Sequence, residues 1–230
     1  MRRWLLGYSI ILILSLLAAY WSSHTVTAFI ESSPPARRHT IIVDAGHGGI
    51  DGGATSCTGV LESRLNLEIA LRLNDLLQFM GHKTVMVRTE DVSVYTKGET
   101  IAAKKVSDLK ERVRIVNETQ NGLLLSIHQN NFHDHRYSGA QVFYAESEGS
   151  EKLAARLQQA LIFYLNPDSS RKEKKSKGVY LMEHVQCPGL LIECGFLSNP
   201  QEESNLRNQQ YQNALCAVIA CTLTEILANT

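Results

Sequence analysis

Residues 40–53 read TIIVDAGHGGIDGG, a β-branched run that leads into a histidine set among five glycines. Isoleucine and valine favour buried strands, and glycine permits the positive φ angles and the close approach that a ligand-binding turn needs. The segment therefore predicts a strand that delivers Asp44 and His47 to a glycine-walled opening in the fold. The alternative is a surface turn with an incidental histidine, because glycine-rich turns after strands are common.

Strand-like and helix-like segments alternate along the rest of the chain. Apolar residues recur with helical spacing in stretches that begin near Glu62, Leu109, Leu153 and Gln209. The segments with strand composition are residues 40–44, 83–88, 122–128, 140–145, 178–182 and 190–194. Such alternation is typical of parallel pairing with helices on both faces of a sheet. We expect an α/β fold, a single domain over residues 39–230 with a mostly parallel or mixed twisted sheet of about six strands.

Length and composition are those of an ordinary globular protein. The chain has 230 residues, of which 44% are hydrophobic and 20% charged, and its 23 Lys and Arg balance its 23 Asp and Glu. A neutral chain without an arginine-rich patch is not expected to bind nucleic acid. The basic stretch 169–177 reads as a solvated loop, with a contact to an anionic polymer as the alternative.

The N-terminus predicts export from the cytoplasm. Two arginines precede an uncharged apolar run over residues 4–21, and Val26 and Ala28 are the small residues that signal peptidase prefers. Residues 1–28 are therefore a signal peptide or, if uncleaved, an N-terminal membrane anchor, which would be the chain's contact with the membrane. The polar, proline-containing segment 29–38 reads as a linker. The domain is expected on the outer side of the membrane, secreted or anchored.

The cysteines do not indicate a disulfide framework or a zinc–thiolate site. Their number, five, is odd, and no two are spaced as a CxxC pair. Cys194, Cys216 and Cys221 have apolar neighbours and are most simply small buried hydrophobic residues.

Three predicted strands end in groups that can bind a metal or move a proton. His47 and His128 follow two of them, and Glu193 ends the most hydrophobic run of the mature chain, where an unpaired carboxylate would be costly. Glu62 opens the first predicted helix, close enough in sequence to fold back toward His47. Two imidazoles and one carboxylate are the ligand set of a catalytic zinc site, and a further carboxylate can act as general base.

Each of these residues also has a purely structural interpretation. A single histidine at a strand end is often part of the packing, and a glutamate in the first turn of a helix complements the helix dipole. On residue types alone, His47, Glu62 and His128 as ligands and Glu193 as base are a hypothesis.

The order and context of these residues resemble those of a known family, the zinc-dependent N-acetylmuramoyl-L-alanine amidases of type 3 (AmiC-like). The resemblance extends from about residue 39 to the C-terminus. The matching segments are residues 42–54 (IVDAGHGGIDGGA), Glu62 with Asn66, residues 87–89 (VRT), 109–112 (LKER), 116–117 (VN), 126–130 (SIHQN), 139–144 (GAQVFY) and 188–199 (PGLLIECGFLSN).

The resemblance implies a site and a reaction. One Zn²⁺ per chain would be held by the residues that match His47, Glu62 and His128, and Glu193 would be catalytic. The substrate would be peptidoglycan, glycan strands with stem peptides, cut at the amide between the lactyl group of N-acetylmuramic acid and L-alanine. Asp44, Asn130 and His184 are expected behind the ligands or along the substrate groove, with Asp44 orienting His47.

Within the family, the chain resembles the germination-specific amidases of the spore cortex, whose cleavage precedes formation of muramic δ-lactam. The short polar region between Arg88 and Leu109 suggests an open groove, with control by a separate regulatory protein as an alternative. A vegetative wall autolysin or a division amidase of the same family is a second interpretation. A third is a zinc carboxypeptidase on stem peptides, in which Arg88 or Arg112 would anchor a terminal carboxylate.

Two further features near these motifs have simpler interpretations. Cys194 follows Glu193, but strand alternation points its thiol away from the centre. His133 and His135 are expected to be exposed loop histidines, although a contact with substrate or a second metal pair is the alternative.

Overall fold

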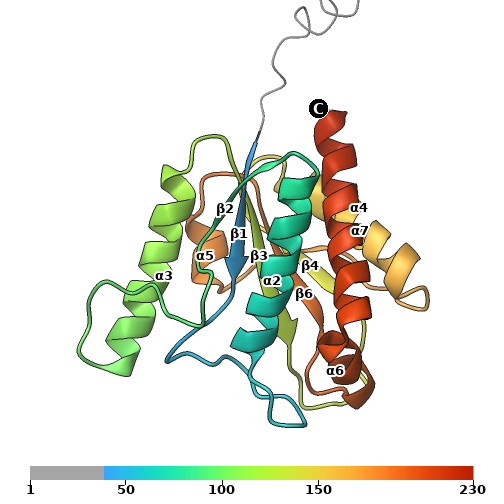
Figure 1. Ribbon diagram of the computed structural model, residues 1–230, viewed down its shortest axis with the longest axis horizontal. Helices are drawn as coiled ribbons and strands as arrows, with labels where there is room; N and C mark the ends of the chain where they lie inside the picture. Colours follow the sequence, from blue (N-terminus) through green and yellow to red (C-terminus); the bar gives the residue numbers. More distant parts are fainter. Residues whose placement is uncertain (1–38, 230) are drawn as a thin grey trace, which may run out of the picture. The chain divides into compact units, whose positions relative to one another are not determined.

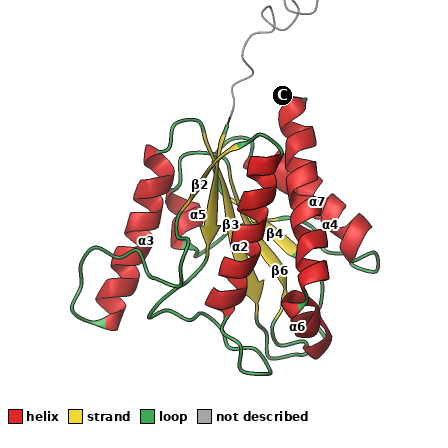
Figure 2. Cartoon of the chain, in the orientation of Figure 1, coloured by secondary structure: helices red, strands yellow, loops and turns green. Residues whose placement is uncertain are grey.

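A six-stranded mixed sheet forms the centre of the computed structural model, which describes residues 39–229 (Figure 2). The predicted export segment 1–28 and linker 29–38 lie outside the described residues. The strands are β1 (Thr40–Ala45), β2 (Lys83–Met86), β3 (Gly122–Asn130), β4 (Gln141–Tyr144), β5 (Lys174–Lys175) and β6 (Gly189–Phe196). The helices are α2 (Glu62–Phe79), α3 (Ile101–Glu118), α4 (Ser150–Leu165), α5 (Tyr180–His184), α6 (Pro200–Arg207) and α7 (Gln209–Ala228).

The strand order is β2-β1-β3-β6-β4-β5. β1 pairs in parallel with β2 and β3, and β3 pairs in parallel with β6, whereas β4 runs antiparallel to β6. The expected α/β class and mixed six-stranded sheet are confirmed. Because β1, β3 and β6 are parallel and adjacent, their carboxyl ends meet at one edge of the sheet, where ligand sites of such folds lie.

Successive residues of the strands point alternately to the two faces of the sheet and pack into two separate hydrophobic cores. Ile41, Val43, Leu125 and Ile192 pack with α2, α4 and α7, while the intervening residues, such as Ile42, pack with α3 and α5 on the other face. Figure 1 shows α2 and α7 side by side, and α3 beside α5 toward the opposite side of the sheet. The second core contains fewer buried residues than the first.

The prediction of a strand over residues 178–182 is wrong. Residues 180–184 form α5, a short helix, and its residues Leu181 and Met182 are buried in the α3-side core together with Val185, which directly follows the helix. Apolar residues at positions i, i+1 and i+4 share one face of a helix but not of a strand. The strand that completes the six-stranded sheet is instead β5, which consists of two exposed lysines. It lies within residues 169–177, which were expected to form a solvated loop.

Helix α7 is long and apolar enough to cross a membrane by length and composition. Its residues Leu215, Cys216, Ile219 and Leu223 are buried in the core shared with α2 and α4. The core helix of a folded domain passes the same test of composition, and the packing explains the apolarity of α7.

Leu125 in β3 tests the larger core. Its side chain is fully buried, and truncation to alanine leaves a cavity, so Leu125→Ala should lower the free energy of unfolding by about 2–5 kcal/mol in urea titrations. Phe79→Ala is the matched control, because Phe79 is 88% exposed at the end of α2 and should change stability by less than about 0.5 kcal/mol. Equal losses in both variants would contradict this description of the core.

Candidate metal centre

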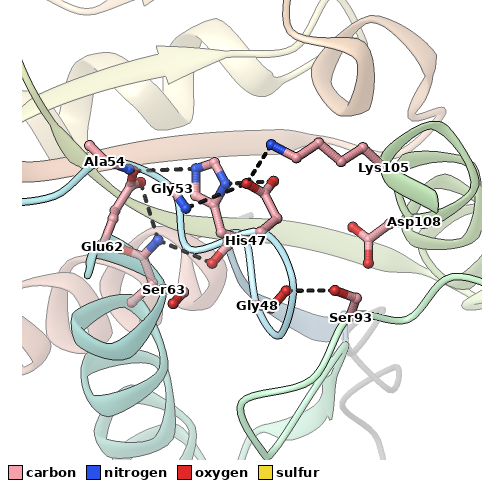
Figure 3. Close-up of polar contacts among 12 residues, drawn as sticks. His47, Gly48, Gly53, Ala54, Glu62, Ser63, Ser93, Lys105 and Asp108 are labelled. Atoms are coloured by element: carbon pink, nitrogen blue, oxygen red, sulfur yellow. Dashed lines mark hydrogen bonds and ion pairs between the residues drawn. The ribbon is translucent and has the colours of Figure 1, made fainter. Parts of the chain in front are cut away.

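The glycine-rich turn after β1 presents the imidazole of His47. His47 has a φ of 61°, a left-handed conformation that is unusual for a residue with a side chain. Gly48 and Asp51 exchange backbone hydrogen bonds of 2.8 and 3.1 Å, which closes the turn. The turn fixes the ring so that Nδ1 lies 3.0 Å from Asp51 Oδ2 and Nε2 lies 3.3 Å from Glu62 Oε2 (Figure 3).

Glu62, the first residue of α2, lies at the centre of the site. Its side chain is buried, and Oε2 accepts a hydrogen bond of 2.9 Å from the backbone N–H of Ala54. Oε1 accepts bonds of 3.2 Å from Asn66 Nδ2 and from the N–H of Gln129. Burial alone would raise the pKa of Glu62, but the hydrogen bonds and charges of His128 and His47 outweigh it and hold that pKa far below its ordinary value.

His128 arrives from β3 and packs against the β1 turn. Its Nδ1 lies 3.0 Å from Glu62 Oε1. The ring lies directly over Gly46, where a Cβ atom would come within 2.2 Å of His128 Nε2. Gly46 therefore has no side chain because the imidazole occupies that space, which explains one of the five glycines of the motif.

The structure brings together the three residues predicted to bind metal. One ligand atom from each of His47, Glu62 and His128 lies within 4.8 Å of the others. Burial lowers the pKa of an imidazole, but the hydrogen bonds and charges of Glu62 and Asp51 outweigh it and raise the pKa of His47 to about 9. A proton between the imidazole and the carboxylate thus takes the place that a divalent cation could take.

Glu193 lies beside His128 in the register of β6 against β3. Its Oε2 atom is buried and accepts no hydrogen bond from the described residues. Burial, together with the negative charge of Glu62, outweighs the opposing charges of His128 and His47 and raises the pKa of Glu193 to about 7. A carboxylate left without a donor beside a cation site is suited to binding a water molecule or a proton.

A cavity of about 290 Å³ opens beside His47 and His128 on the α3 side of the sheet. Its apolar wall includes Ile50, Leu109 and Leu191, and its polar residues include Lys104. The cavity places a partly apolar space for a small substrate group next to the two histidines.

The prediction that Asp44 orients His47 is corrected by the structure. Asp44 is buried with its carboxylate paired to the Arg112 guanidinium and to Ser126 Oγ at 2.7 Å, and no described hydrogen bond joins it to His47. The carboxylate on the His47 ring is that of Asp51, which Lys105 Nζ contacts at 2.8 Å from α3 (Figure 3). Asp44 does line the cavity, so it remains near the predicted groove.

His184 and Asn130 lie outside the cavity lining. The exposed His184 ring stacks on Tyr180 at 3.9 Å, and Asn130 contributes its backbone carbonyl to a 2.8 Å bond from Leu197. Cys194 is buried in the core on the opposite face of the sheet from Glu193. His133 and His135 are exposed, as expected.

The sequence did not indicate a role for Asp51 at this site. It suggested Arg88 or Arg112 only as an anchor for a substrate carboxylate, whereas the structure shows that both bind the backbone of the His47 turn. Arg112 donates to the carbonyl oxygens of Ala45 and His47 at 3.0 and 2.6 Å. Arg88 donates to those of Ala45 and Gly46 at 2.8 and 3.0 Å. The spacing of Asp51 could have predicted its contact, because a carboxylate four residues after a histidine in a closed turn can reach the imidazole ring. Nothing in the sequence showed where the arginines would point.

Comparison with known proteins places this geometry in a family. A family model described as N-acetylmuramoyl-L-alanine amidase matches residues 41–225. The germination-specific N-acetylmuramoyl-L-alanine amidase of Bacillus subtilis is 39% identical over 189 residues, which cover 81% of this chain and 79% of that protein.

Solved structures show the same fold. The CwlD amidase from Clostridioides difficile, solved in complex with the GerS lipoprotein, superposes with a TM-score of 0.80 at 34% identity, covering 84% of this chain and 100% of that one. An N-acetylmuramoyl-L-alanine amidase from Clostridium difficile 630 gives a TM-score of 0.73 at 29% identity, covering 84% and 99%.

Asp51 should strengthen metal binding through the His47 ring. A carboxylate on the outer nitrogen of a ligating imidazole fixes its tautomer and raises its basicity, so Asp51→Asn should weaken zinc affinity about 10- to 100-fold. Competition with a chromogenic chelator measures this. Asp134→Asn, a carboxylate on a loop outside the centre, is the control, and an unchanged affinity in Asp51→Asn would contradict the assignment.

Glu193 should make the stability of the metal-free protein depend on pH. Its pKa rises from 4.5 to about 7 on folding, so its contribution is complete below about pH 4.5 and is lost as the pH rises through about 7. Relative to wild type, Glu193→Gln should therefore gain about 2–3 kcal/mol in free energy of unfolding between about pH 4.5 and pH 8.

Urea unfolding of the chelator-treated proteins at both pH values checks this expectation. Glu148→Gln, which changes an exposed carboxylate, should show no such gain. A difference between Glu193→Gln and wild type that does not vary with pH would refute the raised pKa.

Proposed function

This chain belongs to the family of N-acetylmuramoyl-L-alanine amidases, and we propose that His47, Glu62, His128 and Glu193 carry out its reaction. In that reaction water cleaves the amide between the lactyl group of N-acetylmuramic acid and the L-alanine of the stem peptide. The observation that carries the assignment is the cluster itself, three ligand atoms within 4.8 Å of one another beside Glu193, whose buried Oε2 atom has no hydrogen-bond partner among the described residues.

The donor set fits a zinc ion. Two imidazole nitrogens and one carboxylate oxygen match the protein ligands of catalytic zinc sites, which keep a further position open. His47 and His128 each turn a nitrogen toward Glu62, so small shifts of these side chains suffice to surround a cation. Bound there, zinc would supply Lewis acidity for a carbonyl and lower the pKa of water toward about 7.

Glu193 is the proton carrier in this proposal. In its ionised form, Oε2 takes a proton from the attacking water, because no other donor occupies that atom. The resulting carboxyl then returns the proton to the nitrogen of L-alanine as the amide bond breaks. A pKa near 7 in the metal-free protein suits a group that must act in turn as base and acid.

Other residues of the site keep the reacting groups in place. Asp51 and Lys105 hold the outer edge of the His47 ring. The cavity beside His47 and His128 gives a partly apolar space for one side of the scissile amide and limits water there.

The carboxypeptidase alternative lacks its expected anchor. Arg88 and Arg112, which could have bound a terminal carboxylate, are buried, and their guanidinium groups donate to the backbone carbonyls of the His47 turn. Arg112 is also paired with Asp44 and Asp108. Both guanidinium groups are thus already engaged within the protein, which supports the amidase.

We further propose that the protein acts outside the cytoplasm, on the peptidoglycan of the spore cortex. The predicted export segment at residues 1–28 and the 39% identity to a germination-specific amidase support this location. Removal of the stem peptide would prepare muramic acid for δ-lactam formation. A vegetative wall amidase of the same family is the alternative, and the two differ in the wall they cleave.

A regulatory protein partner is part of the same proposal. The CwlD amidase, 34% identical, was solved in complex with the GerS lipoprotein. This chain is proposed to bind a regulatory protein in the same way.

Product analysis tests the reaction. The zinc-loaded domain should release stem peptides that begin with L-alanine from cortex peptidoglycan, as measured by mass spectrometry of the muropeptides. Glu193→Gln should retain zinc but lose at least about 100-fold in kcat, because a positioned general base contributes about that much or more. Release of D-alanine alone would instead identify a carboxypeptidase.

Two comparisons complete this experiment. Glu148→Gln, remote from the centre and exposed, should retain full activity. Faster cleavage of vegetative wall than of cortex would contradict the cortex role while leaving the amidase assignment intact.

A further inference from the structure

The loop over residues 131–139 lies at the catalytic edge of the sheet. It begins directly after Asn130, the last residue of β3, which lies two residues beyond His128. It leads through Ala140 into β4, which begins at Gln141. Gln141 is the register partner of Glu193 across the antiparallel β4–β6 pair. Both ends of the loop therefore adjoin the proposed reacting groups.

Hydrogen bonds to neighbouring segments, one of which joins His135 Nδ1 to the Ser198 carbonyl at 2.5 Å, hold this loop and the following Ala140 in one conformation. Asn199 Nδ2, at the start of α6, donates to the carbonyls of His135 and Tyr137 at 3.0 and 3.2 Å. The other bonds are Phe132 N to Ser198 Oγ (3.1 Å), Arg171 Nε to the Ser138 carbonyl (2.8 Å), Gly139 N to Glu202 Oε1 (2.8 Å) and Ala140 N to Asn166 Oδ1 (3.1 Å). A loop pinned this closely presents its side chains with little remaining freedom.

The side chains that it presents include two large exposed aromatic rings. Phe132 is 42% exposed and Tyr137 46% exposed, and their rings meet edge to face at 4.9 Å. Tyr137 is stacked over the buried Phe196 at 6.1 Å, and the Arg171 guanidinium lies 4.8 Å from the Phe196 ring. Two exposed rings that lie together on a rigid loop indicate a binding surface more strongly than single exposed apolar residues do.

A β-bulge brings this surface to the same face of the sheet as Glu193. The pairing of β6 with β3 shifts between His128–Glu193 and Asn130–Phe196. Cys194 and Leu197 both enter the α2-side core, so Phe196 and Glu193 share the opposite face. Phe196 lies three positions after Glu193 in the chain, which corresponds to roughly 10 Å along the sheet.

We propose that Phe132 and Tyr137 form a sugar-binding subsite that holds a pyranose ring of the glycan strand next to the N-acetylmuramic acid that carries the scissile amide. The inference rests on the proposed function, since it assigns the glycan part of that substrate to a surface. Aromatic faces carry partial negative charge, and the C–H groups on one face of a pyranose carry partial positive charge and stack on them. Polar side chains at the rim suit the sugar hydroxyls.

Those rim groups include donors and acceptors. His133 lies against Phe132 with ring centroids 4.2 Å apart, and the exposed Arg136 and the Asp134 carboxylate follow in the same loop. Hydroxyl groups both donate and accept, so a rim with both kinds of group matches a sugar better than an apolar protein surface.

A second exposed aromatic pair provides the control. Phe163 and Tyr164 on α4 are 74% and 67% exposed, with ring centroids 4.8 Å apart and also edge to face. They belong to a helix that packs on the other face of the sheet, and neither side chain is among those that hold the 131–139 loop. Replacing either pair removes similar aromatic area, but only the loop pair should affect the glycan.

The test uses the zinc-loaded chain and two substrates, polymeric peptidoglycan and N-acetylmuramoyl-dipeptide, which has a single sugar. The double variant Phe132→Ala/Tyr137→Ala should raise KM for the polymer about five- to tenfold with kcat unchanged, and should leave kcat/KM for the single-sugar substrate unchanged. Phe163→Ala/Tyr164→Ala should change neither, and Phe132→Trp/Tyr137→Trp should restore the polymer KM.

Calorimetric titration with tetrasaccharides from peptide-free glycan strands separates this inference from the proposed function. Wild type should bind them and the loop double-alanine variant should lose about five- to tenfold in affinity, a result that needs no turnover. Wild type that binds glycan but cleaves neither substrate would overturn the amidase and keep the subsite. Unchanged polymer KM and glycan affinity in the loop variant, or an equal loss on the single-sugar substrate, would overturn the subsite and assign the rings to another partner.

Discussion

The buried carboxylate of Glu62 is the interaction on which the site depends. It receives donors from the β1 turn, from α2 and from the end of β3, through His47, Ala54, Asn66, His128 and Gln129. Burying an unpaired carboxylate would cost several kcal/mol, so the fold is stable only if these three segments converge on it. The same convergence assembles two imidazoles around one carboxylate, a group of side chains that could hold a metal ion.

Two buried arginines hold the backbone that carries His47. Arg88 and Arg112 donate to three successive carbonyl groups, those of Ala45, Gly46 and His47. The left-handed φ of His47 is costly for a residue with a side chain, and the Arg112 bond to the His47 carbonyl helps to maintain it. Asp44 and Asp108 compensate the positive charge of Arg112. Asp44, which was expected to orient His47, instead pairs with Arg112, and Arg112 holds the backbone of the His47 turn.

The two sides of the centre differ in character. Toward α3 and α5 lies a cavity with a partly apolar wall, and along β6 toward the 131–139 loop lie exposed aromatic rings. Under the proposed function, the amide and the stem peptide of the substrate would correspond to the cavity side, and the glycan strand to the side with the exposed rings. The cavity beside His47 and His128 gives access to the strand ends from this face of the sheet.

The sequence by itself determined the α/β class, the helix that begins at Glu62, and the strands that precede His47 and carry His128 and Glu193, because hydrophobic periodicity and glycine placement are local signals. It ended two of these strands too early, since β3 continues to Asn130 and β6 to Phe196. It failed at residues 178–182, where a short apolar run suits a strand and a helix equally. Only the tertiary structure decided which carboxylate meets the His47 ring, where Arg88 and Arg112 point, and that a bulge turns Phe196 toward the Glu193 face. Side-chain partners across 40 or more residues depend on strand order, register and helix placement, and these are fixed by packing of the whole domain rather than by any segment of it.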